Sequence, residues 1–139
     1  IGTDSHIGLN PFEELRILDY GQRLISHSRN TFGNNTSGDN GALAIDAVLR
    51  NGRRAMGSEI KHYFEVGKPL NAFVMSAEHP LIQMTGKQNL TNTLVYASDP
   101  TMNKGTIVNG SWKIKDNKVE HNAIQEDFLK TMNALSNRF

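Results

Sequence analysis

Three stretches of the chain place apolar residues at the spacing of an α-helix. The first covers residues 11–29, where Leu15, Leu18 and Ile25 form one apolar stripe. Asn10 can cap this helix, and Pro11 suits its first position. The stripe leaves the charged residues of the segment for solvent or for a partner; they are Glu14, Arg16 and Arg23.

The second and third helical stretches cover residues 42–56 and 122–137. In the second, Gly57 is a plausible stop, and the apolar face consists of Leu43, Ala44, Ala47, Val48 and Leu49. In the third, Asn122 is the expected cap, and the stripe consists of Ile124, Phe128, Met132 and Leu135. Residues 30–41 are rich in Asn, Gly and Ser, so they predict a loop.

The remaining apolar runs are short and typical of strands. Residues 68–75 read as a turn that leads into a buried strand, and residues 105–115 read as a hairpin around Asn109-Gly110. A second turn is expected at residues 116–117, and residues 94–97 fit either a strand or the end of a helix. Residues 1–3 read as the end of a strand whose beginning is missing, which suggests the C-terminal piece of a longer protein.

Composition narrows the classes of function. The chain has 139 residues, enough for one domain of ordinary size, and a net charge of +1. It contains no Cys, which excludes a disulfide scaffold, a thiol nucleophile and a thiolate metal site. The charge balance predicts no nucleic-acid partner, and no apolar run approaches the ~20 residues that span a bilayer.

Few residues suggest chemistry by their spacing. The five His residues form no helical i, i+4 pair and no HExxH or HxH motif, so each is expected to be a surface or hydrogen-bonded residue. Asp4, Ser5 and His6 are consecutive, and adjacent residues of an extended chain point to opposite faces, which argues against a catalytic triad. Asp4 follows the apolar strand end, where α/β barrels place site groups, but a turn or cap residue is the alternative.

Residues 2–6, 10–16 and 19–24 carry a resemblance to a known family. They read Gly-Thr-Asp-Ser-His, Asn-Pro-Phe-Glu-Glu-Leu-Arg and Asp-Tyr-Gly-Gln-Arg-Leu. This pattern resembles the formimidoylglutamate deiminases of the amidohydrolase superfamily. Residues 51–57, residues 67–69 and the Asn109-Gly110 hairpin resemble the C-terminal pattern of the superfamily more loosely. After Pro69, the Leu-Asn-Ala-Phe-Val of this chain departs from the usual Ala-Asp-Leu-Val-Val.

For the fold, the resemblance implies an α/β protein: the C-terminal part of a metal-dependent (β/α)8 barrel with part of a small β-sandwich domain, closed by a terminal helix. Residues 1–58 would hold the end of the eighth barrel strand and the closing helices. Residues 59–121 would belong to the small β domain, and residues 122–139 would form the terminal helix. The N-terminal barrel of the same chain would be a missing partner, so these 139 residues alone are expected to be inactive.

For function, the resemblance implies hydrolysis of N-formimino-L-glutamate to N-formyl-L-glutamate and ammonia in histidine degradation. Asp4 matches the family position that ligates a divalent metal, zinc or alternatively iron, and shuttles the proton. Ser5 and His6, beside it, would line the substrate site. The resemblance also implies a cytoplasmic homodimer that acts on a small molecule, with no nucleic-acid or membrane partner.

Two other interpretations stay open. One is another amidohydrolase-superfamily deaminase that acts on a nucleobase-like substrate; the run from Tyr20 to Arg23 favours the deiminase branch over it. The other is a non-enzymatic interaction domain, which predicts a chain that folds cooperatively on its own. The fragment interpretation instead predicts exposed apolar surface.

Overall fold

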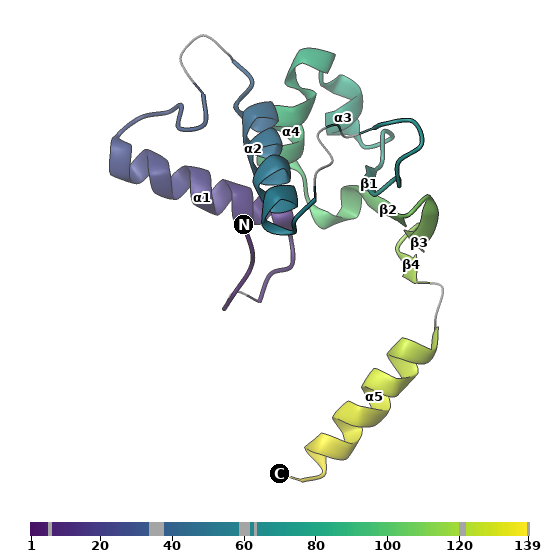
Figure 1. Ribbon diagram of the computed structural model, residues 1–139. Helices are drawn as coiled ribbons and strands as arrows, with labels where there is room; N and C mark the ends of the chain where they lie inside the picture. Colours follow the sequence, from purple (N-terminus) through teal and green to yellow (C-terminus); the bar gives the residue numbers. More distant parts are fainter. Residues whose placement is uncertain (6, 34–37, 59–61, 63, 120–121, 139) are drawn as a thin grey trace. The chain divides into compact units, whose positions relative to one another are not determined.

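The computed structural model describes residues 1–5, 7–33, 38–58, 62, 64–119 and 122–138 (Figure 1). The chain divides into two compact units. The first unit joins Ile1–Glu65 to Ser76–Met102 and is helical; the second joins Val66–Met75 to Asn103–Phe139 and contains a sheet and a helix.

The first unit is built around helix α4. Its elements are α1 (Pro11–Ser26), α2 (Asn40–Ala55), α3 (Pro80–Met84), η1 (Lys87–Asn89), α4 (Leu90–Ala97) and η2 (Pro100–Met102), where η denotes a short 3-10 helix. Both α1 and α2 pack against α4 (Figure 1). Each of these three helices contributes one residue to the buried core, namely Leu15, Ala44 and Val95. Partly buried side chains surround it; they are Phe12, Phe32, Ile45, Val48 and Tyr96.

The ends of α1 and α2 follow local signals. Asn10 caps α1 as predicted, because its Oδ1 accepts a hydrogen bond of 3.0 Å from the Phe12 N–H. The helix ends earlier than expected, at Ser26, and its C-cap residue is His27, which has a φ of +51°. Asp39 caps α2 by accepting 2.8 Å from the Ala42 N–H, so this helix begins two residues before the predicted start. The predicted stop at Gly57 is confirmed by a φ of +68°.

The predicted packing face of α1 is partly wrong. Leu15 is buried, but Leu18 is 39% and Ile25 is 75% exposed. Arg16 and Arg23, expected to face solvent or a partner, lie on the side of α1 that meets α4. Helix α1 carries apolar residues around most of its circumference, so periodicity alone does not tell which side finds a neighbour. Arginine also covers apolar surface with its aliphatic stem while its charged end reaches a polar group.

Residues 76–102 are more helical than the pattern suggested. Residues 94–97, which fitted either a strand or a helix end, are the second half of α4. The short α3 begins after His79, whose Nδ1 accepts a hydrogen bond from the Leu81 N–H. Residues 1–3, predicted as a strand end, form no strand in the described part of the chain, where an isolated extended segment has no ladder of hydrogen bonds to join.

The second unit contains a four-stranded antiparallel sheet. Its strands are β1 (Ala72–Met75), β2 (Asn103–Val108), β3 (Ser111–Lys115) and β4 (Lys118–Val119), and their order in the sheet is their order in the chain. The predicted hairpin is confirmed: Asn109 and Gly110, with φ of +51° and +76°, connect β2 to β3 in the left-handed conformation that two-residue hairpin turns require. The second turn, at residues 116–117, also has positive φ.

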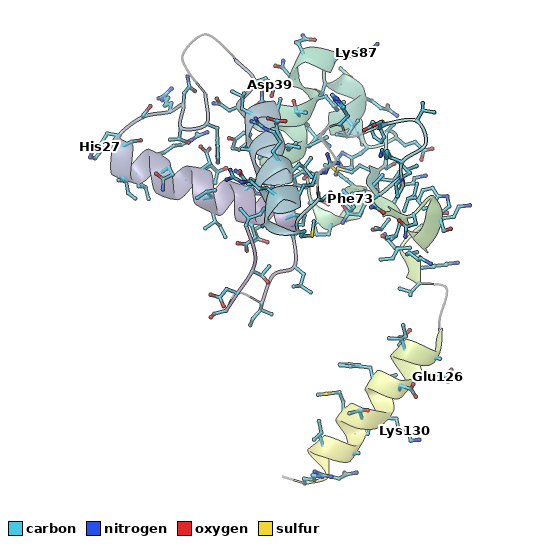
Figure 2. The ribbon with its side chains drawn as sticks, in the orientation of Figure 1. His27, Asp39, Phe73, Lys87, Glu126 and Lys130 are labelled. Atoms are coloured by element: carbon cyan, nitrogen blue, oxygen red, sulfur yellow. The ribbon has the colours of Figure 1, made fainter. Side chains whose placement is uncertain are left out.

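Helix α5 (Asn122–Ser136) confirms the third predicted helix, but its apolar stripe is uncovered. All residues from 123 to 138 are exposed, and the four predicted stripe residues are among them. Phe128, for example, is 61% exposed. Figure 2 labels two of the charged residues of this helix, Glu126 and Lys130. None of the helices in the described ranges is long and apolar enough to cross a membrane.

Candidate functional site

Asp4 lies in an exposed turn before helix α1. Its φ is +42°, a left-handed conformation that Asp tolerates better than most residues. Ser5, in the same turn, is also exposed. His6 lies outside the described residues. The turn conformation of Asp4 matches the alternative interpretation of a turn or cap residue, and Asp4 is exposed.

The described residues do not form a metal centre by themselves. Across the ranges that the structure describes, no group of three or more His, Cys, Asp or Glu side chains could hold a metal ion. A catalytic zinc site needs about three protein ligands. Asp4 could contribute one carboxylate to such a site, and the other ligands would have to come from outside the described residues.

Helix α1, which follows the Asp4 turn, is anchored to the end of α4. Arg16 Nη1 donates hydrogen bonds to the carbonyl oxygens of Val95 (2.8 Å) and Ser98 (3.3 Å). The last carbonyls of a helix have no partner within the helix, and they carry the negative end of its dipole. A guanidinium at this position therefore satisfies both the hydrogen bonding and the charge.

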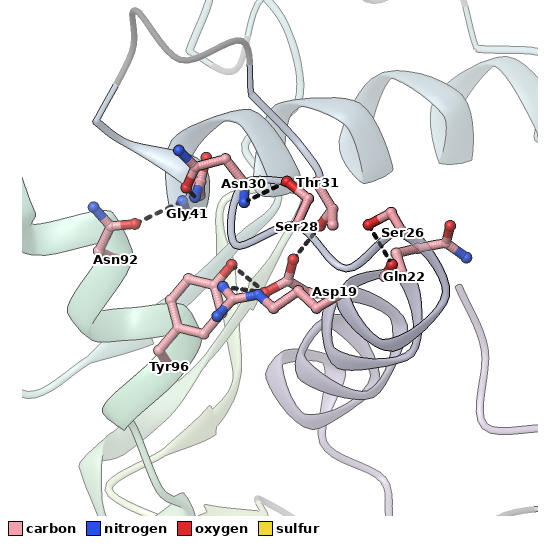
Figure 3. Close-up of polar contacts among 11 residues, drawn as sticks. Asp19, Gln22, Ser26, Ser28, Asn30, Thr31, Gly41, Asn92 and Tyr96 are labelled. Atoms are coloured by element: carbon pink, nitrogen blue, oxygen red, sulfur yellow. Dashed lines mark hydrogen bonds and ion pairs between the residues drawn. The ribbon is translucent and has the colours of Figure 1, made fainter.

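A buried carboxylate, Asp19, forms the centre of a polar cluster between α1 and α4 (Figure 3). Arg23 Nη2 lies 2.5 Å from Asp19 Oδ2, and the Tyr96 hydroxyl donates 2.9 Å to the same oxygen. The Thr31 hydroxyl donates to Asp19 Oδ1. One carboxylate thus connects α1, α4 and the segment that leaves α1; we call Asp19, Arg23, Thr31 and Tyr96 the Asp19 cluster.

The cluster changes the proton affinity of its members. Burial, together with the hydrogen bond to the Asp19 carboxylate, raises the pKa of Tyr96 to about 12. Burial alone would lower the pKa of Arg23, but the hydrogen bond and the charge of Asp19 outweigh it and raise that pKa. The guanidinium carbon of Arg23 also lies 5.6 Å and 5.5 Å from the ring centres of Tyr20 and Tyr96.

A second set of hydrogen bonds attaches the start of α2 to α4. The Thr91 hydroxyl donates 2.6 Å to Asp39 Oδ2. Asn92 Oδ1 accepts a hydrogen bond of 2.8 Å from the Gly41 N–H, which Figure 3 shows. The two helices approach closely here, because a Cβ added at Gly41 would lie 2.5 Å from the Thr91 carbonyl oxygen. A glycine is therefore required at this contact.

These contacts give the Asp19 cluster a structural role: it holds helix α1 against helix α4. The Asp19 carboxylate is occupied by three partners and is inaccessible to a ligand, whereas Asp4 is exposed. The cluster was not predicted from the sequence, although a signal was present: Asp19 and Arg23 have the i, i+4 spacing of a helical ion pair inside the run that carries the family resemblance. Tyr96 and Thr31 had no such signal.

Comparison with known proteins finds a similarity in sequence to a deiminase. A curated formimidoylglutamate deiminase from Pseudomonas aeruginosa is 31% identical to the chain over 118 residues. The chain is a distant relative of this enzyme. The match covers 85% of the chain and 26% of the enzyme, so the chain spans about a quarter of the length of its relative. No family model matches the chain.

Proposed function

We propose that this chain is part of an amidohydrolase-type deiminase that hydrolyses N-formimino-L-glutamate to N-formyl-L-glutamate and ammonia. The observation that carries the proposal is the 31% identity to a formimidoylglutamate deiminase over 85% of the chain. The relative's name points to histidine degradation. The accessible carboxylate of Asp4, in the turn before α1, supports a catalytic role at the position that the family resemblance implies.

Asp4 would act in proton transfer. Water adds to the formimino carbon, and the carboxylate accepts one of its protons. The carboxylate passes this proton to the imino nitrogen. The tetrahedral intermediate then collapses: the hydroxyl oxygen forms a double bond to the carbon and gives its proton to the carboxylate. The carboxylate delivers this second proton to the same nitrogen as the carbon–nitrogen bond breaks, so ammonia leaves and the formyl group remains. A positioned acid or base contributes roughly 100- to 10,000-fold to a rate of this kind. Ser5 and His6 would lie beside the substrate.

A divalent metal, zinc or iron, would be bound by Asp4 together with other residues of the protein. A single exposed carboxylate does not fit a complete site, and the described ranges hold no cluster of three potential ligands. A bound metal would supply a more acidic water molecule at neutral pH. The contribution of this chain would be Asp4, which lies in the turn before helix α1.

Exposed apolar side chains support a larger assembly for the whole protein. On α1, the face away from the core includes Ile17 and Leu24, which are 46% and 77% exposed, and α5 exposes its whole stripe. Phe73 on β1 is 45% exposed (Figure 2). Such surfaces are usually covered by other protein. We propose that the rest of a (β/α)8 barrel, a small β-sandwich and a second subunit pack against these apolar side chains in the whole protein.

The decisive experiment measures ammonia release from N-formimino-L-glutamate by the protein that carries these residues. Asp4→Asn is the sharpest variant, because Asn tolerates the positive φ of the turn but lacks a proton-accepting carboxylate. Asp116→Asn is its matched control, since Asp116 is also an exposed Asp at positive φ, in a hairpin turn of the second unit. We expect Asp4→Asn to lower kcat at least about 100-fold and Asp116→Asn to leave it unchanged.

Other results of this assay would favour one of the two alternative functions or would exclude Asp4 from the mechanism. A folded, metal-loaded protein that releases ammonia from a nucleobase but not from N-formimino-L-glutamate would support a nucleobase-type deaminase. Release from neither substrate would favour a non-enzymatic interaction domain. Full activity of Asp4→Asn on N-formimino-L-glutamate would remove Asp4 from the mechanism while leaving the deiminase assignment in place.

A further inference from the structure

The chain contains three Asn-Gly pairs, at Asn40, Asn51 and Asn109. Asn followed by Gly is the dipeptide most prone to spontaneous deamidation, because no side chain on the second residue hinders attack by its backbone nitrogen. The attack needs a glycine N–H that is free to lose its proton and an Asn side chain that is free to turn toward it. The structure distinguishes the three pairs on both requirements.

Asn40 is the most restrained of the three. Its Nδ2 donates 3.0 Å to Asn30 Oδ1, and its own Oδ1 is buried. The following N–H, of Gly41, donates to Asn92 Oδ1 at the close contact between α2 and α4. Both reacting groups are therefore fixed, and freeing them requires α2 to separate from α4.

Asn51 is exposed but lies in the last turn of α2. Backbone hydrogen bonds continue past it: the Met56 N–H donates 3.0 Å to the Gly52 carbonyl, and the Ser58 N–H donates 2.9 Å to the Arg53 carbonyl. A helical backbone keeps the Gly52 N–H inside the helix and away from the Asn51 side chain. Reaction here requires unwinding of this turn, which breaks several hydrogen bonds together.

Asn109 differs because, among the residues that the structure describes, two exposed hydrogen bonds hold its turn to the segment before β1. The Asn109 N–H donates 2.9 Å to Asn71 Oδ1, and the Gly110 N–H donates 2.9 Å to the Leu70 carbonyl. All four residues are exposed. Solvent-exposed hydrogen bonds at a hairpin tip open at low free-energy cost, and opening these two leaves the Gly110 N–H free.

We propose that Asn109 is a spontaneous deamidation site, and that Leu70 and Asn71 form a clamp that sets its rate. In the open turn, the Gly110 nitrogen loses its proton and bonds to the side-chain carbonyl carbon of Asn109. The carbon–nitrogen bond of the side-chain amide breaks, and ammonia leaves. Water then hydrolyses the resulting succinimide to Asp or to isoaspartate, so the net reaction consumes one water and releases one ammonia.

The product would alter the hairpin. Isoaspartate adds a methylene to the backbone between positions 109 and 110, where a two-residue turn requires positive φ at both residues. Either product also introduces a carboxylate beside a strand that carries Lys113 and Lys115. This inference does not rest on the proposed enzymatic function, because the reaction needs only the turn and water.

The test is quantitative peptide mapping by mass spectrometry during incubation at mildly alkaline pH, with and without urea. In urea, the three sites should react at similar rates, because each is followed by Gly. In the folded protein, we expect Asn109 to react first, Asn51 more slowly and Asn40 slowest. A folded-state order in which Asn40 or Asn51 reacts before Asn109 would overturn the proposal.

Variants at Asn71 test the clamp. Asn71→Ala removes the acceptor for the Asn109 N–H, so deamidation at Asn109 should accelerate about threefold to tenfold. Asn71→Asp keeps an acceptor oxygen at the same place and is the matched control, with a rate close to that of the parent. An unchanged rate in Asn71→Ala would refute the clamp, and the comparison between folded and urea-treated parent protein would still decide whether Asn109 is the site.

Discussion

The Asp19 cluster provides the sharpest stability test, because the chain contains a matched pair in a different environment. Asp19–Arg23 and Asp46–Arg50 are both helical i, i+4 pairs with a nitrogen–oxygen distance of 2.5 Å. They differ in burial: the Asp19 side chain is 1% exposed, whereas that of Asp46 is 40% exposed. The comparison of Asp19→Ala with Asp46→Ala therefore separates the effect of burial and of the two additional hydroxyl donors to Asp19 from that of the i, i+4 spacing.

The expected magnitudes follow from the partners that each substitution leaves behind. Removing one member of a buried ion pair costs roughly 3–5 kcal/mol, and a fully buried hydroxyl left without an acceptor costs roughly 1–3 kcal/mol. The hydroxyls of Thr31 and Tyr96 are only partly buried, so their cost lies at or below the lower end of that range. These costs are not additive, and Arg23, one-third exposed, can turn toward water. We expect Asp19→Ala to lower the free energy of unfolding by about 2–4 kcal/mol. An exposed helical pair contributes about 0.3–0.5 kcal/mol, so Asp46→Ala should change stability little.

Urea denaturation of the parent protein and both variants, followed by circular dichroism, measures these differences. The gain in helix propensity from Asp to Ala applies to both variants and cancels in the comparison. Asp19→Asn adds an intermediate case, because it keeps the volume and an acceptor oxygen but loses the charge. If Asp19→Ala lowers the free energy of unfolding by an amount within about 0.5 kcal/mol of that for Asp46→Ala, the buried cluster does not stabilise the packing of α1 against α4.

Two further substitutions test other contacts of the first unit by the same denaturation assay. Gly41→Ala should cost about 1–3 kcal/mol, because its Cβ would lie 2.5 Å from the Thr91 carbonyl oxygen, whereas Gly52→Ala, with open space around it, should stabilise by about 0.5–1 kcal/mol. Equal effects of the two substitutions would contradict the close contact between α2 and α4. For Tyr96, a folded-state pKa of about 12 against an ordinary value of 10.0 means that the folded protein holds this proton more tightly than the unfolded chain. The free energy of unfolding should therefore fall as pH rises from 10 to about 12, and Tyr96→Phe should flatten that fall; an unchanged slope would contradict the hydrogen bond to Asp19.

Local signals in the sequence were reliable guides to individual elements. Asn10, Gly57 and the Asn109-Gly110 pair act through the backbone of their own neighbours, so the cap, the stop and the hairpin turn could be predicted without knowledge of the rest of the molecule. The existence of α1, α2 and α5 followed in the same way from helical spacing. For Asp4, the immediate sequence left two alternatives, a site group after a strand end and a turn residue, and the structure places it in a turn.

Which side of each helix is covered depended on residues distant in the chain. Arg16 and Arg23 were expected to face solvent or a partner, and they instead bind α4, about 80 residues away for Arg16. Residues 94–97, the second half of α4, fitted either a strand or the end of a helix, because such a run is too short for periodicity to separate the two. The stripe of α5 was predicted correctly as apolar, yet the described structure leaves it exposed.

The candidate site likewise contains one part that the sequence indicates, Asp4, and one part that only the tertiary structure forms, the Asp19 cluster. Asp4 and the family resemblance are properties of short runs of sequence, and they lead directly to the proposed deiminase function. The Asp19 cluster exists only in the folded chain, because Thr31 and Tyr96 reach the carboxylate from 12 and 77 residues away. Backbone conformation responds to adjacent residues, whereas the burial of a charge is set by every element that surrounds it, and only the packing of α1 against α4 brings those elements together.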